Sequence, residues 1–172
     1  MMTEIEKIKK IMVATDGSEP SIRAIRHAIE MARDKGADVL ALSVNTTLVD
    51  VGARGYDVLA QLGSDKHVVD ESVDVHGILT EYYDRIGKPE SLLMAEAGLE
   101  IAATLGEEQG VRVTTLIEHG RATETILKVA EREKVDLIVM GTTGLTGISR
   151  ILIGSTADKV TRLSKCPVMV VH

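Results

Sequence analysis

The chain has 172 residues, a length that suits one domain with a core that needs neither disulfides nor metals. A net charge of −6 argues against a protein that holds nucleic acid through its phosphates, and the one cysteine, Cys166, excludes an internal disulfide and fits a reducing compartment. Because the start of the chain lacks a signal peptide and no apolar run approaches the roughly 18 residues of a membrane span, we expect a soluble cytoplasmic protein that does not bind membranes.

Three elements are predicted from residue 11 to residue 44, in the order strand, helix, strand. The apolar run Ile11–Ala14 predicts a strand that ends near Thr15. Ser18 is expected to cap a helix whose first turn holds Pro20, and Gly36 is expected to end that helix. The apolar face of this helix is expected at Ile22, Ile25, Ile29 and Ala32, and the second strand at Val39–Val44.

The segment Asn45–Lys88 does not follow this alternation, because a simple connection between a strand and a helix is far shorter. We treat it as an insertion in a single domain that covers residues 1–172. Its second half has apolar residues at helical spacing and predicts an additional amphipathic helix, with Val75, Ile78, Leu79, Tyr82 and Ile86 on one stripe. The insertion is expected to lie outside the sheet, as a cover or as a surface for a partner.

Strands and helices alternate again after Pro89. A helix is predicted from there to Gly110, with Leu93, Ala97, Ile101 and Leu105 on one stripe. The remaining elements are expected in this order: a strand at Val111–Glu118 on the edge of the sheet, a helix at Arg121–Glu133 with Ile126, Val129 and Ala130 on one stripe, a strand at Asp136–Met140, a helix at Gly154–Leu163 and a strand at Pro167–Val171. This alternation implies a parallel sheet with right-handed crossovers.

A glycine-rich loop, GTTGLTGISRILIGST from Gly141 to Thr156, joins a buried strand to a helix. Glycines let a ligand approach the backbone closely, and the free N–H groups at the start of a helix attract an anion, so this order predicts a phosphate site. The lysine of a P-loop does not follow the glycines, which excludes a P-loop NTPase. Arg150 is the one cation inside the loop, where it either reaches a phosphate or lies exposed.

The spacing of the glycines is specific. Between a strand that ends in Val-Met and a final Cys-Pro-Val strand, the chain has Gly141, then Gly144 after two residues, then Gly154 after nine more, followed by Ser155. Together with the start IMVATDGSEPSIRAI, this pattern resembles the ATP-binding branch of the universal stress protein family over the chain apart from the insertion. The resemblance implies a three-layer α/β sandwich with five parallel strands, of the adenine nucleotide alpha hydrolase-like type. It also implies a homodimer, which we expect to form through the short apolar last strand.

The resemblance further implies that ATP binds at the C-terminal edge of the sheet. The family's binding residues, carried over by motif position, are Ala14, Thr15 and Asp16 beside the nucleoside, Val44 with its backbone at the adenine, Met140 and Gly141 at the ribose, and Gly144, Gly154, Ser155 and Thr156 at the phosphates. A bare carboxylate at Asp16 would repel phosphates, so we expect either a divalent cation such as Mg²⁺ or Mn²⁺ between them or a simple turn role for Asp16. The insertion starts beside Val44 and is expected to act as a lid on ATP or to pack on the domain.

The sequence favours a regulatory module of a stress response, in which ATP stabilises one conformation that an unknown protein partner recognises. It leaves open an enzyme that uses ATP to adenylate or phosphorylate a substrate or hydrolyses it slowly, and a dimeric interaction module without nucleotide. A catalytic base or nucleophile is not evident, because Cys166 is expected to be a packed residue and the histidines lack the spacing of a metal site. These histidines are His27, His67, His76, His119 and His172.

Overall fold

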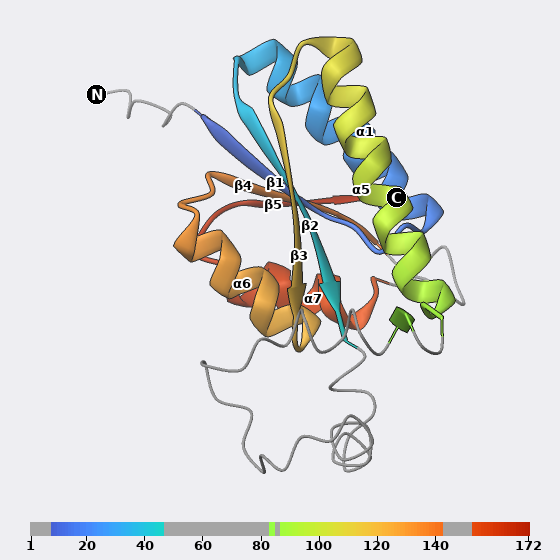
Figure 1. The fold of residues 1–172 in the computed structure, drawn as a ribbon. Coiled ribbons are helices and arrows are strands. Elements are labelled where there is room, and N and C mark those ends of the chain that lie inside the picture. Colours follow the sequence, from blue (N-terminus) through green and yellow to red (C-terminus); the bar gives the residue numbers. More distant parts are fainter. Residues whose placement is uncertain (1–7, 47–82, 85–86, 143–152) are drawn as a thin grey trace.

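A computed structural model describes residues 8–46, 83–84, 87–142 and 153–172. Their strands form a parallel sheet of five strands in the order β3-β2-β1-β4-β5 (Figure 1). The strands are β1 (Lys10–Ala14), β2 (Asp38–Asn45), β3 (Val113–His119), β4 (Leu137–Gly141) and β5 (Val168–Val171). The predicted five-stranded parallel sheet is confirmed, and β3 lies at a sheet edge as expected.

Helices cover both faces of the sheet and make it the middle of three layers (Figure 1). Helices α1 (Glu19–Lys35) and α5 (Glu90–Gln109) lie on one face, and α6 (Ala122–Arg132) and α7 (Ser155–Leu163) lie on the other. Alternate residues of each strand serve the two cores: Ile11 and Val13 pack under α1 and α5, while Met12 packs under α6 and α7. The predicted three-layer sandwich is therefore confirmed. Among the described helices, none is long and apolar enough to cross a membrane.

Helix α1 follows the prediction in its core face and its C-terminus, and departs from it at its N-terminal cap. Ile25, Ile29 and Ala32 are fully buried, and Gly36 ends the helix in the left-handed conformation with φ of 65°. Ser18 occupies the cap position, but its side chain makes no capping hydrogen bond, and its Oγ is buried without a partner. The expected capping role of the Ser18 hydroxyl is therefore wrong for this structure.

Helix α5 forms where it was predicted but turns a different face to the sheet. Leu93 and Ile101 are 50% and 37% exposed, whereas Leu99 and Ala102 are buried. The reason is the position of Gly98, where an added Cβ would lie 2.8 Å from Thr15 Oγ1. Small residues let the helix approach the sheet closely on this side, and that contact outweighs the larger side chains of the predicted stripe. The buried face comprises Leu92, Ala95, Gly98, Leu99, Ala102 and Gly106.

The strand order puts a crevice at the carboxyl edge of the sheet. The chain leaves β1 through α1 toward β2 on one side, whereas β4 pairs with β1 on the other side. Open α/β sheets bind ligands where the direction of winding changes in this way. Most of the insertion, residues 47–82 and 85–86, lies outside the described residues, and with it most of the helix predicted at Val75–Ile86. Tyr83 is described, and it is buried.

Candidate functional site

A cavity of about 350 Å³ opens at the carboxyl edge of the sheet. The ends of β1, β2 and β4 and the first turns of α5, α6 and α7 form its walls. All predicted binding residues that the structure describes line it: Ala14, Thr15, Asp16, Val44, Met140, Gly141, Gly154, Ser155 and Thr156. Gly144 and Arg150 lie outside the described residues. The predicted set thus comes together in space, and its contact with a nucleotide stays a prediction.

The cavity also has walls that the sequence analysis missed. They come from the start of α5, from the start of α6 and from side chains near the end of β2. A motif search could not find them, because α5 is separated from β2 by the long insertion. The simplest signal was positional, since a helix that follows a strand of this parallel sheet begins at the carboxyl edge. The additional lining residues are Ser21, Leu42, Ser43, Asn45, Thr46, Ser91, Leu92, Ala95, Ala122, Ile126, Thr142 and Ala157.

The turn after β1 is held by short polar contacts. Asp16 Oδ1 accepts a hydrogen bond of 3.0 Å from the Ser18 N–H, and Thr15 Oγ1 accepts one of 3.2 Å from the Gly17 N–H. Gly17 has φ of +79°, a conformation that side chains other than glycine rarely adopt. These contacts place the carboxylate of Asp16 on the cavity wall at a fixed position.

The backbone of Val44 faces the cavity. Asp38 N–H donates to Lys9 C=O, and Leu42 C=O accepts from the Thr15 N–H. The N–H and C=O groups of the even-numbered residues of β2 therefore point toward β1. The pairing of β1 with β2 ends at Ala14 opposite Leu42, two residues before Val44. The N–H and C=O of Val44 therefore point into the space beyond the end of β1, where they can form hydrogen bonds with a planar ligand.

The N-terminus of α7 supplies hydrogen-bond donors. Gly154 is the cap residue, and its own N–H donates to Thr142 C=O at 2.5 Å, so that group is already used. Asp158 N–H donates to Gly154 C=O at 2.9 Å and starts the helical ladder. The N–H groups of Ser155, Thr156 and Ala157 belong to the first turn, which has no intrahelical acceptors. They combine with the helix dipole into a site for an anion.

Gly141 has a packing role that is visible in the structure. A Cβ at this position would lie 2.8 Å from the carbonyl carbon of Pro20 and 2.9 Å from the Ser21 nitrogen. The end of β4 therefore touches the first turn of α1, and this contact alone requires glycine. A contact between Gly141 and a ribose stays a prediction.

Residues 7–172 match the model of the universal stress protein family. The chain belongs to this family. Universal stress protein MJ0531 of Methanocaldococcus jannaschii is 36% identical over 166 residues, which cover 95% of this chain and 81% of that protein.

Two solved structures extend the comparison. Protein MJ0577 of Methanocaldococcus jannaschii is 28% identical with a TM-score of 0.64 over 96% of each chain. A universal stress protein solved in complex with cAMP has a TM-score of 0.64 at 24% identity, over 97% of this chain and 99% of that one. This second likeness concerns the fold.

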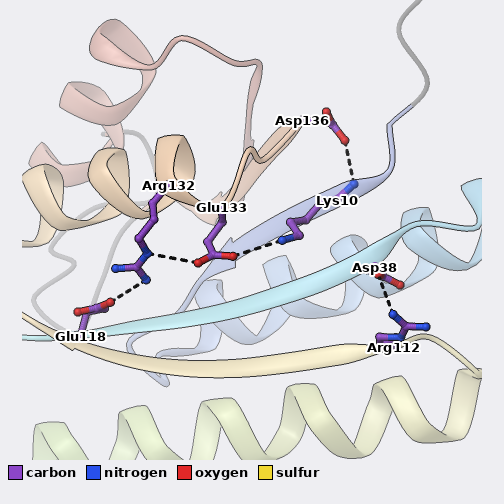
Figure 2. Close-up of polar contacts among 7 residues, drawn as sticks. All are labelled: Lys10, Asp38, Arg112, Glu118, Arg132, Glu133 and Asp136. Carbon is purple, nitrogen blue, oxygen red and sulfur yellow. Dashed lines mark hydrogen bonds and ion pairs between the residues drawn. The ribbon is translucent and has the colours of Figure 1, made fainter.

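Charge is sparse in the cavity of this universal stress protein. Of the described residues that line it, Asp16 is the one with an ionisable side chain. A chain of ion pairs lies elsewhere, from Lys10 through Glu133 and Arg132 to Glu118 (Figure 2). Hydrogen bonds from Arg132 and then Lys10 lower the pKa of the Glu133 carboxyl, and the hydrogen bond to Glu118 raises the pKa of Arg132. The cavity wall is therefore dominated by backbone dipoles and neutral groups.

Within the described ranges, no group of three His, Cys, Asp or Glu side chains comes together as a metal site. His67 and His76 lie outside these ranges. Cys166 is half-buried before β5, and its N–H donates to Ser164 Oγ at 3.2 Å.

Proposed function

We propose that this universal stress protein is a cytoplasmic regulatory module of a stress response that binds ATP as a conformational switch. The observation that supports it most is the cavity, which has anion donors at α7 and a backbone edge at Val44. Family membership supports the same conclusion, and one relative of the same fold was solved with an adenine nucleotide, cAMP. We further propose that one domain, with its insertion at residues 45–88, carries this function.

The proposed pose runs along the carboxyl edge of the sheet. The phosphates lie at the N–H groups of Ser155, Thr156 and Ala157, and the base lies at the backbone of Val44. Strands are about 4.8 Å apart, so β2 and β4, which flank β1, are separated by about 10 Å. The space between these ends has an apolar wall on the α6 and α7 side, which suits the nucleoside: Ala14, Leu42, Val44, Ala122, Ile126 and Met140.

A divalent cation fits this pose as a partner of the phosphates. Asp16 offers one carboxylate on the cavity wall, and one of its oxygens already accepts the Ser18 N–H. Mg²⁺ is commonly held by one or two carboxylates together with substrate phosphates and water. Asp16 would hold such an ion together with the phosphates, and the ion would neutralise the repulsion between them.

The phosphate assignment is tested by placing a negative charge at the N-terminus of α7. Ser155→Asp keeps the fold, because an acidic residue in the first turn of a helix is favourable. It repels a bound triphosphate, and we expect at least a tenfold loss of ATP affinity by calorimetric titration, or about 1.4 kcal/mol. Thr123→Asp is the matched control, since it puts the same charge into the first turn of α6, at a residue that does not line the cavity.

Two results would contradict the proposal. One is wild-type protein that shows no ATP binding, and the other is a Ser155→Asp variant that binds ATP as the wild type does. Mass spectrometry of denatured purified protein adds a test of the class of function. Co-purified ATP supports a switch, AMP or a covalent adduct points to an enzyme, and no nucleotide points to an interaction module.

A further inference from the structure

The cavity extends around the sheet edge onto the face that α1 and α5 cover. Residues 39 and 41 of β2 belong to the core under these helices, so Ser43 and Asn45 lie on the same face by strand alternation. Thr15 follows Ile11 and Val13 onto this face in the same way. Leu92 and Ala95 of α5 form the wall of the cavity on this face of the sheet. We call this part the hydroxyl lobe and define it by Thr15, Ser21, Ser43, Asn45 and Ser91.

Most polar groups of the hydroxyl lobe are already engaged. Ser21 Oγ donates its proton to Ser18 C=O at 2.9 Å. The contact of 2.9 Å between Thr15 Oγ1 and Ser21 Oγ must then use the proton of Thr15, because each hydroxyl has one proton. Asn45 Nδ2 donates to Tyr83 Oη at 3.4 Å, a long hydrogen bond between two buried side chains.

Ser43 differs from its neighbours. Its side chain lines the cavity, and only 2% of the residue is exposed. Among the residues that the structure describes, none forms a hydrogen bond with its hydroxyl. A hydroxyl on a cavity wall that has no protein partner normally forms a hydrogen bond with a ligand or a water. The Ser43 hydroxyl is therefore a binding group whose partner comes from the cavity.

We propose that the Ser43 hydroxyl forms a hydrogen bond with the base of the bound nucleotide. This inference rests on the proposed function, because it takes the phosphates to lie at α7. Ser43 belongs to β2, about two strand spacings or roughly 10 Å from β4, which leads to α7. It is adjacent in the chain to Val44, whose backbone edge faces the same space. The base, rather than the phosphates, is the part of the ligand that reaches β2.

Ser43→Ala tests the contact with little disturbance of the fold. The expected result is a fivefold to tenfold loss of affinity for ATP, as for one hydrogen bond to a buried hydroxyl. The ligand-free variant should melt at about the same temperature as the wild type, because the substitution breaks no hydrogen bond with a described residue. A hydroxyl with a merely structural role would lower that melting temperature instead.

A ligand without a base identifies the part that Ser43 contacts. Ribose 5-triphosphate, measured by competition, should bind wild type and Ser43→Ala with the same affinity. Thr104→Ala is the control, because it removes a hydroxyl from an exposed position of α5 that does not line the cavity, and it should change ATP affinity by less than twofold.

The outcomes separate the two proposals. If the wild type fails to bind ATP, the proposed function fails, and this inference fails with it. If the wild type binds ATP and Ser43→Ala binds it within twofold, Ser43 holds only a water and the inference alone is overturned. An equal loss for ATP and ribose 5-triphosphate also overturns it, because the contact then lies on the sugar or the phosphates.

Discussion

The carboxylate of Asp136 accepts a hydrogen bond of 2.9 Å from the backbone N–H of Lys10, which joins the start of β1 to the start of β4 (Figure 2). The same oxygen, Oδ2, accepts the Lys9 N–H at 2.7 Å. The side chain of Asp136, which lies next to β4, thus fixes the position of the N-terminal end of β1. Because β1 leads directly to Thr15 and Asp16, its placement also governs the turn that borders the cavity.

Asp136→Asn should lower the free energy of unfolding by about 1–2 kcal/mol. The amide keeps one oxygen acceptor but loses the charge that strengthens both hydrogen bonds. Asp38→Asn is the matched control at the start of β2, where the carboxylate meets the exposed Arg112 at 3.5 Å (Figure 2). That exposed pair should contribute less than about 0.5 kcal/mol. Equal losses in urea unfolding of the two variants would contradict this account.

The ion pairs around Glu133 predict a pH dependence of stability. Hydrogen bonds from Arg132 and then from Lys10 lower the pKa of Glu133 below its ordinary value (Figure 2). A depressed carboxyl pKa stabilises the fold above the ordinary pKa, and this contribution is lost as the pH falls through the pKa of the folded state. Glu133→Gln should therefore lower the melting temperature at neutral pH, with a difference from wild type that disappears in acid.

The measurement is a series of melting curves from about pH 7 to about pH 3. Glu30→Gln serves as the control, because Glu30 is an exposed residue of α1 without an ion pair in the described part of the chain. Its difference from wild type should vary little with pH. A Glu133→Gln difference that stays constant, or grows toward acid, would show that the sign is wrong. Added salt should reduce the effect, since these pairs are partly exposed.

Two glycines of α5 allow packing and binding to be separated. A Cβ at Gly98 would lie 2.8 Å from Thr15 Oγ1, at the cavity, whereas a Cβ at Gly106 would collide with the Val113 side chain in β3. Overpacking lowers the free energy of unfolding by about 1–3 kcal/mol, whereas replacing a helical glycine by alanine raises it by up to about 1 kcal/mol. Both Gly98→Ala and Gly106→Ala should therefore lower stability. Only Gly98→Ala should also weaken ATP binding in calorimetry, because it displaces the turn at Thr15 and Gly17.

The strand pattern and the glycine motif predicted much of this architecture. Apolar runs located β1, β2, β4 and β5, because buried parallel strands are apolar on both faces. The motif residues meet in one cavity, because the ends of parallel strands and the starts of the following helices share one edge of the sheet. These are local properties, and a single sequence contains them.

Tertiary contacts decided what the sequence could not predict. The exposed face of α5 has larger apolar side chains than some buried positions, and the close approach at Gly98 chose the buried face. Ser18 is a good capping residue, yet its hydroxyl is buried while its C=O accepts from Ser21 Oγ. Ser43 looks like any polar residue in a strand, and its importance depends on which groups already have partners.

The last strand is predicted to form a homodimer. β5 lies at an edge of the described sheet, pairs with β4 on one side, and has partly exposed apolar side chains at Val168, Met169 and Val170. An apolar edge of this kind favours pairing with a second copy. Light scattering at micromolar concentration should give twice the chain mass of 18.5 kDa. Val170→Asp or Met169→Asp should shift the protein toward monomer, because the charge would be buried between the two edges.

The opposite edge of the sheet supplies the control. Thr114→Asp places the same charge on β3, at an exposed residue of the other edge strand, and should leave the dimer intact. Dissociation by both kinds of variant would point to a general loss of stability, which melting curves of the same samples would reveal. A wild-type protein that remains monomeric at micromolar concentration would refute the dimer, and the open edge of β5 would then need another partner.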